Sequence, residues 1–376
     1  MAENIMREFL FAQDDMNDVN SIVEKFAEVG AAATYAQFGG HGIIEKVELD
    51  NYKEEEKRIK DACVSFAASK AGIDYPKTPT EVAYALDNTV FRDILNTIMV
   101  RTIGTMMVRY NSPQLDALVE VQPVEVGASF TYEIDTKALP VAQRATYGSN
   151  VTMVPSYAMG AKTLKPIPYS IGLSLDYIRI IANGYDWGRA IARVYAGMLF
   201  AQYNIVVSKL FNTNALNGTP FYNATFSATA YTQLADDIKM LNGGAAVTAY
   251  GTITAWQTIS ALATQGGFTT KDEYIRNAYL QKIYGVDSMV LDQFTNYAAP
   301  FTTANAASLR AIPNNLIVLL SSGDKVMKLA RENYIRVIET PANNNTLNRN
   351  EYSFFQSFDA DIATASQYGL QSTQAG

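Results

Sequence analysis

Helical spacing of apolar residues predicts two helices in the first part of the chain. From Asn51 to Gly72, apolar residues recur at steps of three, four and seven, which is the period of one helix face. That face carries Tyr52, Ile59, Cys63 and Phe66. A second helix is expected to begin after Thr78, because Pro follows at the first helical position and Glu81 stands three residues on. This second pattern fades near Gly104.

The most regular helical pattern lies between Trp187 and Phe211. Its apolar positions alternate in steps of four and three, and Asp186 is placed to cap the first turn. About 25 residues at ~1.5 Å per residue would form a rod of about 38 Å. Further helices are expected over Tyr231–Leu241, after Thr254, over Lys271–Ile283 and from Asp324 through Leu329.

Two stretches alternate strictly between apolar and polar residues, which is the period of a half-buried strand. They are Val124–Asp135 and Ile167–Leu175. Because Pro166 and Pro168 have no N–H to donate, the second strand should begin at a sheet edge. The segment between the two strands is far too long for a tight hairpin turn, and loops of such length often carry function.

The second half of the chain alternates between strand and helix patterns, which is typical of an α/β arrangement. Five strands are expected there, over Val247–Tyr250, Val286–Leu291, Leu316–Leu320, Tyr334–Ile338 and Tyr352–Phe358. The run Leu316–Leu320 is apolar throughout, so we expect it to be buried on both faces. A polar tail is expected after the last strand.

Composition sets the class of the protein. The chain has 376 residues, of which 48% are hydrophobic and 18% charged, so it should fold into two or three globular domains. Its net charge of −7 argues against broad binding of nucleic acid through phosphate contacts. No apolar run reaches the ~18 residues that a membrane-spanning helix needs.

Residues that usually carry chemistry are scarce. The single cysteine, Cys63, and the single histidine, His41, exclude a disulfide framework within the chain and multi-Cys or His-rich metal sites. Cys63 lies on an apolar helix face, so a buried, inert thiol is favoured over a nucleophile. His41 lies in a Gly-rich loop, where a solvated side chain is the default.

Nucleotide-binding and hydrolase motifs are also missing from the sequence, which contains no GxxxxGK[ST], no GxGxxG after a strand and no GxSxG. Two carboxylates could still meet in space, but Asp359 and Asp361 are interpreted as surface or turn residues. We therefore expect no enzymatic activity, no catalytic residue, no cofactor and no metal ligand.

One charge pattern stands out. From Thr136 to Leu175 there is no Asp or Glu, and four basic residues give this segment +4, which leaves −11 for the rest of the chain. A cationic arm of this kind suits an acidic surface on a neighbouring subunit. The candidate contact residues are Arg144, Lys162 and Lys165. The alternatives are chance variation in composition, or charges that only keep a long loop soluble.

The order of these parts resembles the major capsid protein of tailed bacteriophages, the Hong Kong 97-type fold. Three passages carry the resemblance. They are IPYSIGLSLDYIRIIANGYDWGRAIARVYAGMLFAQYNIVVSKLFN, YLQKIYGVDSMVLDQF and LIVLLSSGDKVMKLARENYIRVIETP. They are similar to the family's extended loop returning to a spine helix, to its segment entering an axial strand, and to its strand, short helix and strand leaving the axial domain.

The resemblance implies an α+β fold divided into four parts. Residues 1–110 would form an N-terminal arm with lead-in helices, and residues 111–175 an extended β loop with its base strands. Residues 176–241 and 330–376 would form the peripheral domain with the spine helix, and residues 242–329 the axial α/β domain. Residues 138–165 should protrude from the body and pack on another chain, because such a loop has too few local contacts to offset its ordering entropy.

By the same resemblance, the chain would be the structural subunit of an icosahedral phage head. It would self-assemble into pentamers and hexamers that enclose double-stranded DNA without reading its sequence. Its partners would be copies of itself, a portal, and decoration or scaffolding proteins, and no membrane. Assembly would take place in the host cytoplasm, with the virion as the final location, and the acidic charge suits a wall that must not bind packaged DNA.

Two other functions stay open. One is an encapsulin-type nanocompartment shell, which shares the fold but usually lacks so long an N-terminal arm. The other is a soluble α/β enzyme with an unrecognised carboxylate site, which would leave the acid-free segment from Thr136 to Leu175 unexplained.

Overall fold

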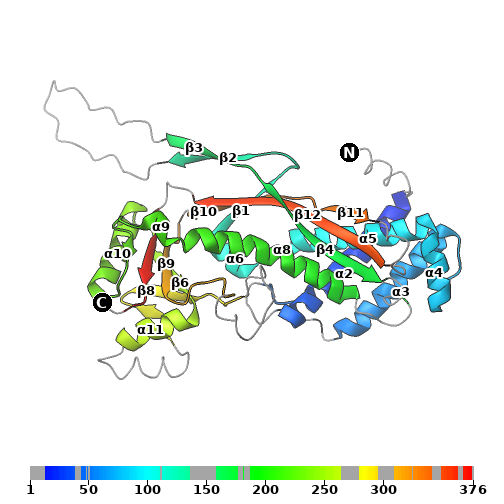
Figure 1. The fold of residues 1–376 in the computed structure, drawn as a ribbon, viewed down its shortest axis with the longest axis horizontal. Helices are drawn as coiled ribbons and strands as arrows, with labels where there is room; N and C mark the ends of the chain where they lie inside the picture. The colour runs from blue at the N-terminus through cyan, green and yellow to red at the C-terminus, as the bar shows by residue number, and fades with distance from the viewer. Residues whose placement is uncertain are drawn as a thin grey trace. The chain divides into compact units, whose positions relative to one another are not determined.

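A computed structural model describes most of the chain and divides it into two units (Figure 1). The described residues are 13–38, 44–47, 49, 51–110, 112–135, 158–176, 181, 187–263, 279–294, 309–323, 325–340, 349–362 and 367–374. The helical unit comprises Met1–Pro113, Ile167–Ala201 and Glu332–Ser357, and the sheet unit comprises Gln114–Pro166, Gln202–Arg331 and Phe358–Gly376. The predicted division into arm, β loop, peripheral and axial domains stays a prediction.

Packed helices form the body of the helical unit. They are α2 (Gln13–Phe38), α3 (Tyr52–Ala71), α4 (Pro79–Asp87), α5 (Thr89–Arg109) and the first part of α8 (Trp187–Leu210). The Phe26 and Trp187 rings meet edge-on at 5.1 Å, and both side chains are buried, so α2 and α8 share one core. The long helix predicted from Trp187 is therefore confirmed, with its apolar stripe inside.

Helix ends follow the predicted signals only in part. Thr78 and Glu81 form the expected capping box at the start of α4, and Gly72 ends α3 in the left-handed region at φ 67°. Asn51 precedes α3 but makes no side-chain cap. Asn88 splits the second predicted helix, because it ends α4 and caps α5. Its side-chain oxygen accepts hydrogen bonds from the backbone N–H groups of Val90 and Phe91.

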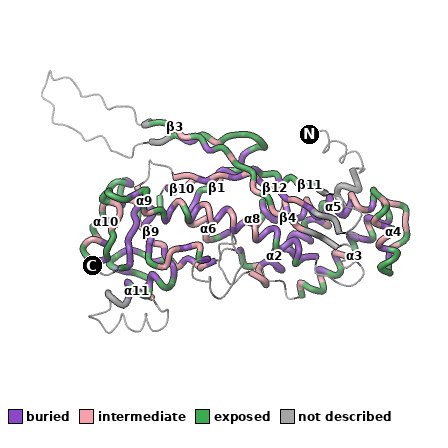
Figure 2. The backbone as a smooth tube through the Cα atoms, in the orientation of Figure 1, coloured by how far each residue is buried: buried purple, intermediate pink, exposed green. Residues whose placement is uncertain are grey.

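A short sheet completes the helical unit. β11 (Arg336–Thr340) runs antiparallel to the first half of β12 (Arg349–Ile362), and β4 (Ile167–Asp176) also pairs with β12. The buried hydroxyl of Tyr352 donates a hydrogen bond of 2.8 Å to Oδ1 of Asn96, which ties β12 to α5. Buried positions alternate along β12, whereas the residues of β4 and β11 whose burial is described are exposed or intermediate (Figure 2).

A six-stranded sheet organises the sheet unit, in the order β5-β13-β9-β6-β8-β7. The strands are β5 (Tyr222–Asn223), β6 (Val247–Gly251), β7 (Lys282–Ile283), β8 (Val286–Val290), β9 (Leu316–Ser321) and β13 (Gly369–Ser372). Helices α10 (Ala228–Leu241) and α11 (Ile253–Ala263) pack on it. Trp256, Tyr231 and Ile317 are among the fully buried residues of this core, and β9 is buried along its whole length, as predicted.

A smaller sheet region belongs to the same unit. β10 (Met327–Glu332) lies between β1 (Val119–Val124) and the second half of β12, with Lys328 opposite Asp361. Two short helices complete the description: α6 (Pro113–Leu118) spans the start of this unit's first segment, and α9 (Thr213–Leu216) lies within its second.

Besides the split at Asn88 and the C-terminal tail, three expectations about elements are wrong. The segment after Asp324 forms strand β10 where a helix was expected, because its apolar residues pair with β12. The stretch from Val124 to Asp135 is interrupted by a turn at Gly127, whose φ of 76° lies in the left-handed region that favours glycine. Lys282–Ile283 forms a strand at the end of the helix expected from Lys271, whose earlier residues lie outside the described part.

The polar tail is the largest difference from expectation. Residues 369–372 form β13, which lies inside the six-stranded sheet, antiparallel to β9 and parallel to β5. All four residues are buried, and Gln371 is satisfied because it donates to the carbonyl of Thr225 and accepts from Asn223.

The chain thus has the mixed α+β class that the sequence predicts. Within the described residues, one helical stretch from Trp187 is long and apolar enough to cross a membrane by length and composition alone. Most of that stretch is buried inside the protein, which is typical of a core helix.

Candidate interface site at the root of the β-ribbon

Two strands form a separate ribbon in the sheet unit. β2 (Phe130–Asp135) and β3 (Ala158–Leu164) pair antiparallel as a two-stranded sheet, with Phe130 opposite Leu164 and Tyr132 opposite Lys162. An irregularity falls between Ile134 and its neighbour. We call β2 and β3 the ribbon. A two-stranded sheet is only marginally stable in water, so the ribbon needs support from another surface.

An apolar cluster supplies part of that support at the root of the ribbon. Tyr132 of β2 and Leu164 of β3 are buried together with Val124 of β1 and Ala330 of β10, and Phe130 packs against them. These side chains come from both ribbon strands and from the sheet beneath. The root is therefore fixed to the body of its own unit.

Charged residues supply the rest. Nζ of Lys162 lies 2.5 Å from Oδ2 of Asp361 on β12. Nζ of Lys209, near the end of α8, lies 3.8 Å from carboxylate oxygens of both Asp359 and Asp361, and it donates a hydrogen bond to the carbonyl of Ala360. We call Lys162, Lys209, Asp359 and Asp361 the anchor cluster. Two lysines there meet two carboxylates.

A fourth ion pair continues the cluster across the sheet. Lys328 stands opposite Asp361 in the register of β10 and β12, and its ammonium group pairs with Glu120 on β1. Positive and negative charges therefore alternate over three neighbouring strands. Such an arrangement holds segments in place with no net charge of its own.

The hydrogen bonds of the cluster shift two pKa values. Burial pushes the pKa of Asp361 upward, but hydrogen bonds from Lys162 and from the backbone N–H of Ile362 outweigh it, and the pKa falls below its usual range. Burial raises the pKa of Tyr132 to about 12, and the carboxylates of Asp361 and Asp359 add to that shift. Asp361 therefore stays ionised at neutral pH, and Tyr132 keeps its proton to donate to the carbonyl of Ile362.

This geometry suits attachment better than acid–base chemistry. A general acid needs a raised pKa, and Asp361 has a lowered one. Asp359 and Asp361 do not lie in a turn as one of the two interpretations expected, because both are on β12. Their side chains are partly exposed, as expected of surface residues, but they face lysines. Their alternation with the buried Phe358 and Ala360 was the signal that could have placed them on a strand.

The three candidate contact residues differ in their surroundings. Lys162 has its partner, Asp361, within the same chain, which the sequence did not indicate. Lys165 is exposed and forms no ion pair with any residue that the structure describes. Arg144 lies outside the described residues, and so do His41 and the helix cap Asp186. Whether these lysines and Arg144 meet a neighbouring subunit stays a prediction.

The buried thiol of Cys63 and the acidic side chains were the other candidates for chemistry. Cys63 is fully buried, and burial raises the pKa of its thiol, so the expected inert role fits its surroundings. Within the part of the chain that the structure describes, no three His, Cys, Asp or Glu residues gather where they could hold a metal ion.

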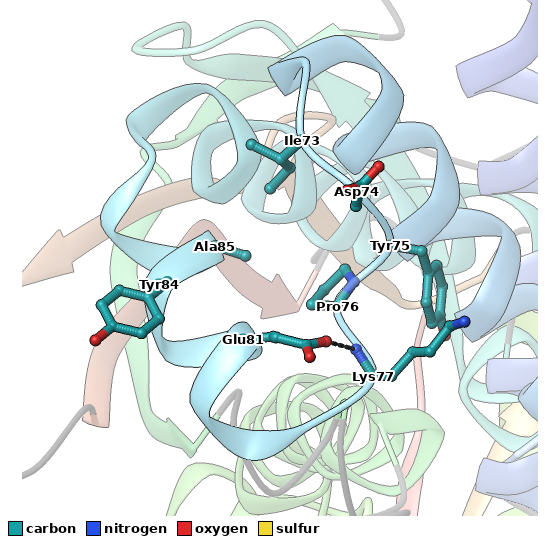
Figure 3. A pocket seen from close by; sticks show the side chains of 8 residues that line it. All are labelled: Ile73, Asp74, Tyr75, Pro76, Lys77, Glu81, Tyr84 and Ala85. Atoms are coloured by element: carbon teal, nitrogen blue, oxygen red, sulfur yellow. Dashed lines mark hydrogen bonds between the residues drawn. The ribbon is translucent and has the colours of Figure 1, made fainter.

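A cavity of about 690 Å³ lies beside α4 (Figure 3). Glu81, one of its lining residues, is engaged in the capping box, where it accepts hydrogen bonds from the backbone N–H groups of Lys77 and Thr78 at 2.7 and 3.3 Å. Those bonds lower the pKa of Glu81, so it remains an ionised cap and is a poor general acid.

No family model matches this chain, and no curated protein matches it either. Among solved structures it is similar to a chain of the cyanophage P-SCSP1u capsid, with 11% identity over 69% of this chain and 87% of that one and a TM-score of 0.46. It is similar to a chain of the satellite phage P4 procapsid, with 9% identity, coverage of 75% and 91% and a TM-score of 0.45. It is also similar to the SrpI encapsulin of Synechococcus elongatus PCC 7942, with 10% identity, coverage of 70% and 88% and a TM-score of 0.40.

Proposed function

We propose that this chain is the structural subunit of an icosahedral shell, of the kind built by the major head proteins of tailed bacteriophages. Copies would assemble into pentamers and hexamers around double-stranded DNA. The observation that carries the proposal is the path from the ribbon through β4 into α8, in which a two-stranded ribbon leads back to one long buried helix. This is the order of extended loop, return strand and spine helix that the resemblance implies.

The anchor cluster supports a role in assembly. It fixes the root of the ribbon to β12, while the strands of the ribbon pair only with each other in the described part of the chain. A ribbon held at its root and lacking a third strand can present its outer part to another subunit. The predicted packing of residues 138–165 on a neighbouring copy would then apply to the part beyond the root, because Lys162 and Leu164 contact their own unit. Arg144 and Lys165 would supply positive charge to that contact.

The low content of reactive residues agrees with a structural role. A shell subunit acts through its interfaces, which fix curvature and closure, so it needs no catalytic constellation. Its net charge of −7 would keep the wall from adhering to packaged DNA. A portal and decoration or scaffolding proteins would be further partners, and the assembled head of the virion would be the final location.

The test is to produce the chain alone and follow its size by size-exclusion chromatography and negative-stain microscopy. Closed particles of megadalton mass are expected. A stable monomer or small oligomer at all protein and salt concentrations would contradict a shell of any kind. Nucleic acid inside particles recovered from infected cells would favour a phage head, whereas an enzyme cargo would favour the encapsulin alternative.

A further inference from the structure

The cavity beside α4 has exposed aromatic and acidic side chains that the capping of α4 by Glu81 does not explain. Its rim carries Tyr84, which is 73% exposed and is the most exposed of the large hydrophobic side chains in the described residues. Figure 3 shows Tyr84 and Tyr75 on opposite sides of the hollow, with Pro76 between them and Asp74 above. We call this hollow the tyrosine groove. Its volume of about 690 Å³ lies within the range of pockets that hold ligands, about 300–1,000 Å³.

The tyrosine groove is acidic as well as aromatic. Asp74 is exposed and forms no ion pair with a described residue, and Glu81 keeps its negative charge while it caps α4. Lys77 is the one basic residue of the lining, and Figure 3 shows its side chain passing Tyr75 on the side away from Tyr84. A segment that enters between the two tyrosines should therefore carry exposed apolar groups and a positive charge.

A described segment with those properties, and with two prolines besides, lies at the start of β4. Lys165 and Pro166 join β3 to β4, and the first two residues of β4 are Ile167 and Pro168. The side chain of Ile167 is 56% exposed although it is large and aliphatic. Lys165 is exposed beside it and has no acidic partner among the described residues. We call these four residues the proline knuckle.

The proline knuckle is rigid before it binds anything. Each proline fixes its own φ near −65°, and the residue before each proline is restricted to extended conformations. Little conformational entropy is lost when such a segment docks, and aromatic grooves are the surfaces that recognise extended proline segments. The two prolines would pack on the ring faces of Tyr75 and Tyr84, and Lys165 would form an ion pair with Asp74.

We propose that the tyrosine groove receives the proline knuckle of a second copy of this chain. Among the described residues, the lining of the groove includes none from the knuckle, so a knuckle that occupies the groove would come from another copy. This contact rests on the proposed shell function and assigns residues to one of its interfaces. Because groove and knuckle are different surfaces, each copy would offer both, which is the head-to-tail arrangement that closes into rings.

Cross-linking between two variants tests the contact. One variant carries Tyr84→Cys and the other Ile167→Cys, and the two are mixed before assembly and oxidised with oxidised glutathione. A disulfide can form only where the two Cα atoms lie within about 7 Å. The native Cys63 is fully buried, so it should not compete. A disulfide-linked dimer of the two variants is expected on a non-reducing gel.

The matched control replaces Tyr84→Cys by Met240→Cys, since Met240 is 69% exposed but lies at the end of α10. The Tyr84 and Ile167 mixture should give at least about tenfold more linked dimer than this control. Equal yields in intact particles would overturn the docking while leaving the shell function standing. If the unmodified chain formed no particles at all, the shell function would fail by its own measurement, independently of the gel.

Charge reversal gives a second test should the cysteine variants not assemble. Lys165→Glu and Asp74→Lys should each reduce the yield of particles several-fold at low salt, and the two changes together should restore it. A double variant that assembles no better than either single variant would overturn the pairing. Both positions are exposed, so neither change should prevent the subunit from folding.

Discussion

The ion pair between Lys162 and Asp361 should hold the root of the ribbon against β12, and its contribution to the free energy can be measured. The perturbations are Lys162→Met, Asp361→Asn and the two together. An exposed ion pair contributes ~0–1 kcal/mol, whereas a hydrogen bond to a charged group contributes ~1.5–3 kcal/mol. The two side chains are 38% and 28% exposed, so they lie between these limits. We expect a coupling energy of about 1 kcal/mol.

Amide hydrogen exchange of the unassembled subunit provides the assay, because it reports local opening of the ribbon. A loss of about 1 kcal/mol should speed exchange in β2 and β3 by about fivefold. Amides of β9, in the core of the same unit, serve as the internal control and should not change. Lys209 still faces Asp361 in the Lys162 variant, so the double-mutant cycle isolates the Lys162 contribution.

The dependence on pH and salt follows from the lowered pKa of Asp361. A carboxylate whose pKa is lower in the folded than in the unfolded chain stabilises the fold above its unfolded pKa, about 3.9. The coupling should therefore be complete at pH 7, decline below about pH 4 and vanish as the pH passes the lower pKa of the folded form. It should also weaken in 1 M salt. If the effects of the two single variants on the opening free energy were additive at pH 7, the coupling energy would be zero, and the ion pair would not anchor the ribbon.

Three further predictions concern the core, the C-terminal strand and the outer charges. Met198→Ala should lower the free energy of unfolding by ~2–5 kcal/mol, measured by urea titration, because the side chain is fully buried in α8; a loss under 1 kcal/mol would contradict that burial. Removing residues 369–374 should leave β9 paired with β6 alone and speed hydrogen exchange of the β9 amides that face β13; unchanged protection of those amides would show that β13 is dispensable. Replacing Arg144 and Lys165 by Gln, with Lys162 intact, should reduce assembly and its sensitivity to salt; assembly equal to the parent at every salt concentration would exclude them from the interface.

Long, regular patterns were the part of the fold that the sequence could predict. The helix from Trp187 and the strand from Leu316 were found because their burial is continuous along one face or on both. The short run Val326–Leu329 was misinterpreted because four residues fit either period. Its pairing with β12, some thirty residues later, decides for a strand.

Contacts between segments that are distant along the chain could not be predicted from the sequence. β13 contains one large apolar residue, Leu370, and its Gln371 is buried only because Thr225 and Asn223 satisfy it. The anchor cluster likewise joins charges from β3, α8 and β12, which no spacing rule connects. The acid-free segment did indicate that Lys162 needs an acidic partner, but the sequence alone could not show that one lies within the same chain.

The interleaving of the two units has a consequence for how the chain is made. Each unit is built from three separated segments, so neither is complete until its last segment has been synthesised. The helical unit needs residues up to Ser357, and the sheet of the other unit needs β13, about 15 residues later. At ~5–20 residues per second, a ribosome adds that stretch in about 1–3 s. Both units therefore become complete almost together, and an unfinished chain would offer its neighbours no properly folded surface on which to assemble.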